Sequence, residues 1–185
     1  NAILSRALGE KDQKTVNRVA ETGVFLALAS FVVFLLVGIF FSRPFFLSQT
    51  DDMEIVEYGT QYISICCIFS FGIYFELVFE RMLQSTGKTI FSMFSQLIGA
   101  LTNIVLDPIL IFGLLGAPKM GVAGAAAATV AGQILAAIVA FVLNHKFNRD
   151  VRISLRGIFR PKLDFIVNIY KVGLPSIVMQ SIGSV

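Results

Sequence analysis

Two polar side chains stand out because they lie four residues apart inside an apolar stretch. Asn103 and Asp107 share one face of a helix at this spacing, and Pro108 follows directly. An Asp at the centre of a membrane helix costs about 2.5–3.5 kcal/mol, and such a residue usually marks an ion or substrate path. Pro108 disfavours helical geometry at Asp107 and removes a backbone donor. We interpret this face as part of a cation site; the alternative is a buried carboxylate that a neighbouring helix satisfies.

Partner residues are expected from the next apolar stretch. If the two stretches form an antiparallel hairpin that turns at Pro118, Thr129 comes to the depth of Asp107 and Gln133 comes level with Asn103. Asn103 and Thr129 would supply neutral oxygens suited to a hard cation, and Gln133 and Glu76 are predicted as possible cavity or gating residues. The small residues that precede Thr129 are expected to serve close helix packing instead.

Glu76 is a further candidate in an apolar stretch. It lies about one turn from the end of that stretch, so its carboxylate has a transport role, reaches the membrane interface or pairs with Arg81. The sequence shows no phosphate-binding glycine loop, no metal-spaced His/Cys set and no plausible triad with its single His. We therefore expect a protein that is not an enzyme.

These residues are positioned by apolar segments long enough to cross a membrane. The 185 residues are 56% hydrophobic and 15% charged, whereas soluble domains carry about 25% charged residues. A spanning helix needs about 20 mostly apolar residues. The sequence predicts a fifth, truncated span from residue 167 and four full spans at residues 22–42, 58–79, 90–115 and 121–143. The predicted fold class is an all-α polytopic membrane protein, and the chain ends lead us to expect a fragment.

Basic residues outside the spans alternate in number along the chain. Lys and Arg number four before the first span, then one, two, one and six in the successive loops. Because cytoplasmic loops are enriched in Lys and Arg, we expect residues before 20, 80–90 and 144–166 on the cytoplasmic side of a bacterial inner membrane. The net charge of +3 belongs to these loops and does not predict nucleic-acid binding. The segment from Leu163 to Tyr170 is either a short interfacial helix or a basic loop held by anionic lipid.

Several stretches of this sequence resemble the multidrug and toxic compound extrusion (MATE) family. The most specific are NIVLDP at 103–108 with Ile111-Phe112-Gly113, and PKMGVAGAA at 118–126. SRALG at 5–9, QSTGK at 84–88 and GLP at 173–175 follow the family order as well. The resemblance implies a twelve-helix fold with two six-helix lobes. Residues 1–166 would form most of the N-lobe, starting at the end of its second helix, and residues 167–185 would start the first helix of a C-lobe that is otherwise missing.

The resemblance also implies a function and a site. Family members exchange drugs or organic cations for Na⁺ or H⁺ by alternating access, with no cofactor besides the coupling ion. In Na⁺-binding members the N-lobe site resembles a set that Asn103, Asp107 and Thr129 match here, together with the Ala125 backbone carbonyl. Some members use a Glu early in the seventh helix. This chain has Gln180 in that neighbourhood, predicted as a possible cavity or gating residue, so the resemblance does not carry that variant of the mechanism over.

Two other functions remain open at the level of sequence. A lipid-linked saccharide flippase of related architecture should carry more basic residues in its cavity-lining helices, and these spans have almost none. A non-transporting membrane scaffold or receptor would make poor use of a buried Asn-Asp-Thr cluster. The expected partners are therefore membrane lipids, cationic or apolar small molecules and the missing C-lobe.

Overall fold

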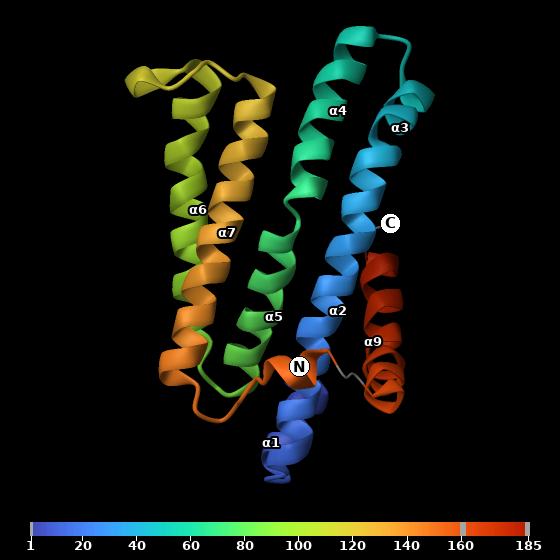
Figure 1. The fold of residues 1–185 in the computed structure, drawn as a ribbon, viewed down its shortest axis with the longest axis vertical. Helices are drawn as coiled ribbons and strands as arrows, with labels where there is room; N and C mark the ends of the chain where they lie inside the picture. Colours follow the sequence, from blue (N-terminus) through green and yellow to red (C-terminus); the bar gives the residue numbers. More distant parts are fainter. Residues whose placement is uncertain (1, 160–161, 184–185) are drawn as a thin grey trace.

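The computed structural model describes residues 2–159 and 162–183, and every regular element in these ranges is helical. The helices are α1 (Ala2–Gly9), α2 (Gln13–Phe40), α3 (Ser42–Gln49), α4 (Met53–Ile68), α5 (Phe71–Ser85), α6 (Thr89–Phe112), the short 3-10 helix η1 (Leu114–Gly116), α7 (Val122–Phe147), α8 (Leu155–Ile158) and α9 (Leu163–Gly183). Figure 1 shows α6 and α7 as a hairpin on one side, α4 and α5 at the centre and α2 on the other side, with α9 beside α2.

The membrane-spanning character of the helices agrees with the prediction. In the described ranges α2, α6 and α7 are each long and apolar enough to cross a membrane, and α4 with α5 makes a fourth span if the bent pair counts as one. The four predicted full spans thus correspond to α2, α4–α5, α6 and α7. The all-α polytopic fold class is confirmed, while several boundaries differ.

The first span begins earlier than the predicted residue 22. α2 starts at Gln13 because Asp12 caps it: the carboxylate accepts hydrogen bonds from the Thr15 hydroxyl at 2.5 Å and from the Thr15 N–H at 3.2 Å. These bonds lower the pKa of Asp12 below its usual value, the hydroxyl bond most. The prediction was wrong because it admitted no charged residue, whereas charged turns are tolerated where a helix leaves the membrane.

The second span is two helices rather than the single helix predicted for residues 58–79. α4 and α5 meet at 47°. At the break the N–H of Ser70 donates to the carbonyl of Cys67 at 3.2 Å, and the N–H of Gly72 donates to that of Phe69 at 3.3 Å. These bonds span three residues instead of four. Neighbouring Gly and Ser residues are a common cause of such kinks.

The third span ends at Phe112 rather than at residue 115. Gly113 takes a left-handed conformation with φ of 74°, which suits a glycine at a helix C-terminus. α6 also continues through Pro108, so Asp107 keeps a helical position, contrary to expectation. The proline removes one backbone donor there, and the α6 backbone packs closely against Gly124 of α7 just beyond it.

α6 and α7 form the predicted hairpin with a different register. The returning chain bonds back onto the end of α6: the N–H groups of Met120 and Gly121 donate to the carbonyls of Leu110 and Ile111 at 3.0 and 3.3 Å. The hairpin therefore turns nearer to Gly116 than to Pro118. As a result α7 is displaced by about one helical turn from the predicted alignment.

The C-terminal segment forms one helix instead of two elements. Either a short interfacial helix or a basic loop was predicted at 163–170, with a span starting at residue 167, but α9 runs without a break from Leu163 to Gly183. α7 likewise extends past the predicted residue 143 to Phe147. Gln180 belongs to α9, and its side chain lies outside the described part of the structure.

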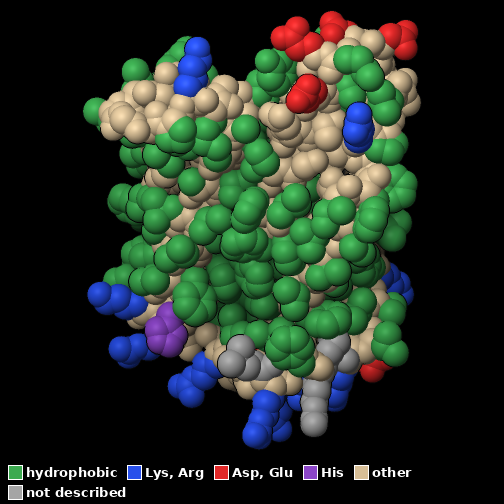
Figure 2. Space-filling model, turned by 45° about the horizontal axis from the view of Figure 1, so that its top comes forward, with side chains coloured by type: hydrophobic (Ala, Val, Ile, Leu, Met, Phe, Trp, Pro, Cys, Tyr) green, Lys and Arg blue, Asp and Glu red, His purple; other side chains and the backbone are tan. Residues whose placement is uncertain are grey.

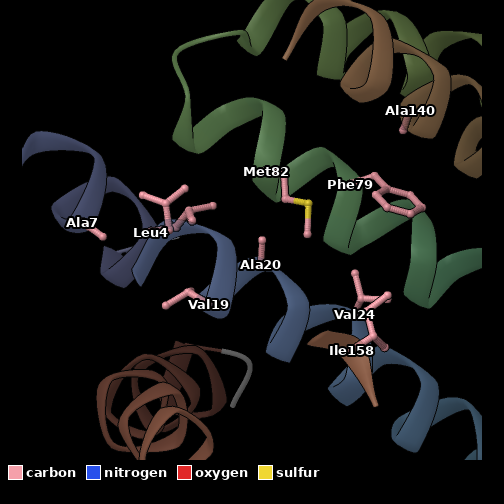
Figure 3. Close-up of a cluster of buried hydrophobic side chains, with 10 residues drawn as sticks. Leu4, Ala7, Val19, Ala20, Val24, Phe79, Met82, Ala140 and Ile158 are labelled. Carbon is pink, nitrogen blue, oxygen red and sulfur yellow. The ribbon is translucent and has the colours of Figure 1, made fainter. Parts of the chain in front are cut away.

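A buried apolar cluster joins one end of the bundle. Figure 3 shows side chains from α1, α2, α5, α7 and α8 meeting there. Its members are Leu4, Ala7, Val16, Val19, Ala20, Val24, Phe79, Met82, Ala140 and Ile158. Although α8 comes after α7 in the chain, this cluster packs it against α2.

The two ends of the bundle carry opposite charges. Figure 2 shows acidic side chains gathered at the end that holds the α3–α4 turn and basic side chains gathered at the other end. We call the latter, which holds α1, the α5–α6 turn and the segment that follows α7, the basic end. The three loops predicted to share one side of a membrane all lie at this end (Figure 1).

Candidate functional site

The candidate site lies where α6 and α7 approach each other most closely. Three glycines allow this approach. A Cβ atom on Gly132 would lie 2.7 Å from the carbonyl oxygen of Gly99, and one on Gly124 would lie 2.5 Å from that of Leu110. Small residues let helices pack backbone to backbone in lipid. The interpretation of these small residues as packing elements agrees with their burial at the interface.

Asn103 and Thr129 face each other across this interface. The Asn103 amide lies 3.3 Å from Oγ1 of Thr129, and the Thr129 hydroxyl donates to the carbonyl of Ala125 at 3.0 Å. The predicted alignment was wrong by one turn, because it placed Thr129 beside Asp107 and Gln133 beside Asn103. The hydrogen bonds that close the hairpin set the observed pairing.

Asp107 joins this group through Asn103. When the Asn103 amide oxygen faces Thr129, the amide nitrogen donates to Oδ2 of Asp107 at 3.2 Å. The other carboxylate oxygen, Oδ1, is buried and accepts no hydrogen bond from the described residues. A buried oxygen without a partner is rare in native proteins and requires an explanation.

Four oxygen atoms that could act as ligands for a hard cation therefore come from neighbouring positions. They are the Asp107 carboxylate, the Asn103 amide oxygen, the Thr129 hydroxyl and the Ala125 carbonyl. Carboxylate, carbonyl and hydroxyl oxygens suit hard cations, whereas the described residues contain no cluster of His, Cys, Asp and Glu that could hold a transition metal. The donor set fits an alkali cation or a proton on the carboxylate.

A cavity of about 320 Å³ opens beside Asn103 and Thr129. Glu76 and Gln133, both predicted as possible cavity or gating residues, line its wall, and so does Gln96. Glu76 does not pair with Arg81, whose guanidinium instead donates to Gln84 at 2.8 Å. The wall carries carboxylate, amide and hydroxyl groups and no Lys or Arg among the described residues.

A second buried carboxylate extends this polar path, and the sequence analysis missed it. Glu80 is 2% exposed, accepts a hydrogen bond from the Gln96 amide at 2.8 Å and contacts the Ser95 hydroxyl at 3.4 Å. Its spacing of four residues from Glu76 is the signal that could have found it. Gln96 thus connects the cavity to a buried acid that has no basic partner in the described ranges.

The structure brings most of the predicted site residues together. Asn103, Asp107, Thr129 and the Ala125 carbonyl form one hydrogen-bonded group, and Glu76 and Gln133 share the adjoining cavity. Gln180 is not placed at this site, because its side chain lies outside the described part.

The sequence matches one family model and several curated transport proteins. The family model described as MatE matches residues 1–109. A probable multidrug resistance protein NorM of Bacillus cereus is 26% identical over 174 residues, and it covers 94% of this chain. A multidrug export protein MepA of Staphylococcus saprophyticus is 27% identical over 176 residues, covering 95% of this chain. The chain spans 38% of the length of each relative.

Solved structures show the same fold. An outward-facing multidrug resistance MATE family transporter of the MOP superfamily superposes with a TM-score of 0.85 at 30% identity, over 96% of this chain and 39% of that chain. Its inward-facing counterpart gives a TM-score of 0.82 at 29% identity, over 95% and 39%. A MOP superfamily transporter from Pyrococcus furiosus, described as having a binding pocket of reversed polarity, gives 0.83 at 29% identity, over 96% and 38%.

Proposed function

This chain belongs to the MatE family of multidrug efflux transporters, and on that premise we propose that it supplies most of the N-lobe of a secondary antiporter. The antiporter exports organic cations or apolar drugs in exchange for Na⁺ or H⁺. The relatives are about 2.5 times as long as this chain, which spans 38% of their length. The remaining length has room for a second lobe, which would close the transport path.

The observation that carries this proposal is the incomplete hydrogen bonding of Asp107. Its Oδ1 is buried without a donor, and Asn103, whose amide lies 3.2 Å from Oδ2 of Asp107, links the carboxylate to Thr129 and the Ala125 carbonyl. A Na⁺ ion or a proton on this carboxylate would satisfy it. Neutralising a buried charge changes which arrangement of a helix bundle is favoured, and that is how an ion gradient drives alternating access.

The charge of the adjoining cavity supports a cationic or apolar cargo. Glu76 lines the cavity, Glu80 lies behind Gln96, and no basic side chain of the described residues faces it. An anionic saccharide-phosphate cargo would be repelled by these carboxylates. The flippase alternative is thus less favoured.

We place the basic end on the cytoplasmic side of the membrane, because cytoplasmic loops are enriched in Lys and Arg.

Flux measurements with the full-length protein in lipid vesicles test the proposal. We expect an imposed Na⁺ gradient or an imposed pH gradient to drive uptake of a fluorescent organic cation, and protein-free vesicles to show none. The two gradients are applied separately, so the coupling ion is identified in the same experiment. Vesicles in which neither gradient moves the dye would refute antiport of cations.

Replacing Thr129 with Val should weaken binding of the coupling ion without changing the shape of the site. Val keeps the β-branched side chain and removes the oxygen that contacts Asn103. A hydrogen bond or ligand contact to a charged group contributes about 1.5 kcal/mol at the lower end of its range, so the half-saturating ion concentration should rise about tenfold.

Thr129→Ser is the matched control, because it keeps the hydroxyl group. Ion titration of dye uptake should give nearly the wild-type half-saturation for the Ser variant. If the Val and Ser variants had the same half-saturating ion concentration, the Thr129 hydroxyl would not be a ligand of the coupling ion.

A further inference from the structure

A second cavity, of about 830 Å³, lies at the basic end and shares no lining residue with the cavity beside Asn103 and Thr129. Three separate parts of the chain form its wall: the first turns of α2, the segment around α8 and the start of α9. Each part contributes basic side chains. They are Lys14 and Arg18 from α2, Arg156 from α8 and Lys162 just before α9.

The fold holds this cavity open by tying the segment before α8 to α2. The N–H of Ser154 donates to Oε1 of Glu21 at 3.1 Å, and the N–H of Arg152 donates to Oδ1 of Asn17 at 2.9 Å. Gly157 lies directly on the Glu21 carboxylate, so that any side chain at this position would collide with it. Arg156 is therefore held on a docked segment rather than on a free loop.

The charges in this cavity do not balance. Glu21 is the acid in its wall, and it is already occupied by the Ser154 N–H and by Arg18 at 3.8 Å. Lys14, Arg156 and Lys162 make no ion pair or hydrogen bond with another side chain in the described ranges. Like charges from three elements repel one another unless an anion lies between them.

Other acids at the basic end do not line the cavity: Asp12 caps α2 through Thr15, and Asp164 is exposed in the first turn of α9. Glu10 pairs with Arg6 at 2.8 Å, and Asp150 pairs with Lys88 at 2.5 Å. Apolar side chains flank the cavity instead: Phe165 lines it, and Leu163 in the same segment is 76% exposed. Cations beside exposed apolar groups match an amphiphile with an anionic head.

We propose that this cavity binds a phosphate group, carried either by an anionic phospholipid or by a free phosphate ion. Lys14, Arg156 and Lys162 supply the positive charge, and Arg18 remains with Glu21. A bound phosphate would join α2 to α8 and to the start of α9, and so would fix the segment that leads out of the proposed N-lobe. The lipid source rests on the proposed membrane orientation, in which the basic end meets the cytoplasmic leaflet.

Calorimetric titration of the full-length protein in detergent micelles tests this site. The probes are dihexanoyl phosphatidylglycerol, the zwitterionic dihexanoyl phosphatidylcholine and inorganic phosphate. The variant combines Lys14→Gln, Arg156→Gln and Lys162→Gln. Because each basic residue near a membrane surface contributes about a fivefold change in anion affinity, we expect about a 100-fold loss of phosphatidylglycerol binding.

A matched control removes the same charge from the same end. Lys11→Gln, Lys146→Gln and Arg149→Gln are exposed and do not line the cavity, so this triple variant should bind as the wild type does. Equal losses in both triple variants would show general surface attraction and overturn the proposal. Absence of binding by both anionic probes to the wild type would overturn it as well.

The remaining outcomes identify the source of the phosphate. Binding of inorganic phosphate as tightly as phosphatidylglycerol assigns the site to a free ion, and selective binding of the lipid assigns it to a headgroup. If circular dichroism shows that the triple variant is unfolded, the single change Arg156→Gln, with an expected fivefold loss, takes its place. This assay measures binding and not transport, so its failure would leave the antiport proposal intact.

Discussion

Replacing Asp107 with Asn is expected to reduce ion-driven export by about 10- to 100-fold while the protein still folds. The substitution keeps the size of the side chain and removes the one charged ligand among the four oxygens of the proposed ion site. Contacts to a charged group contribute about 1.5–3 kcal/mol, which corresponds to this range of affinity. Dye flux in vesicles, driven by each gradient in turn, measures the effect.

Folding should not suffer, because the substitution takes an incompletely bonded charge out of the membrane interior. Removing a buried charge together with its desolvation penalty is often neutral or stabilising. The Asn variant should therefore unfold thermally at the wild-type temperature or above it, and a loss of flux cannot then be attributed to misfolding. Asp51→Asn, in the exposed turn between α3 and α4, is the control. Full export by the Asp107 variant would show that this carboxylate does not couple transport.

The part of the site that the sequence predicted well depends on spacing within one helix. Asn103 and Asp107 lie four residues apart, so they share a face in any helix that contains them. For that reason the Asn103 amide can donate to Asp107 when its oxygen faces Thr129. The helical class and the four spans follow from equally local properties, namely length and hydrophobicity.

The part that the sequence did not predict depends on contacts between elements. Thr129 pairs with Asn103 because Met120 and Gly121 bond back to the end of α6, and no residue preference in the turn reveals this choice. Glu80 was missed because its hydrogen-bond partner, Gln96, comes from the next helix. Counting from the middle of a turn thus gives a register to within about one helical turn, which is too coarse to pair ligands.

The same limit applies to the basic end. Charge counting predicted which loops share one side, and the structure places all three at one end of the bundle. It could not predict that the segment after α7 folds back onto α2, because Ser154 and Glu21 are 133 residues apart. The proposed ion site and the proposed phosphate site both depend on contacts between separate segments of the chain.

Gly124→Ala is expected to destabilise the protein and to weaken the ion site at the same time. The added methyl group would lie 2.5 Å from the carbonyl oxygen of Leu110 and 3.1 Å from the backbone nitrogen of Ile111. These are backbone atoms that cannot turn away, so α6 and α7 must separate. Overpacking of this kind costs about 1–3 kcal/mol. Thermal unfolding followed by circular dichroism should show a lower midpoint.

Separating α6 from α7 should also disturb the proposed ion site, because Leu110 lies about one turn from Asp107 on α6. We expect a higher half-saturating ion concentration in dye-flux assays along with the lower midpoint. Gly23→Ala is the matched control: its methyl group would meet only a side-chain atom of Val78 at 3.9 Å, an ordinary contact, and Ala favours a helix over Gly by about 1 kcal/mol. That variant should be unchanged or more stable. If both variants behaved alike, the close approach of α6 and α7 would not be what holds Thr129 against Asn103.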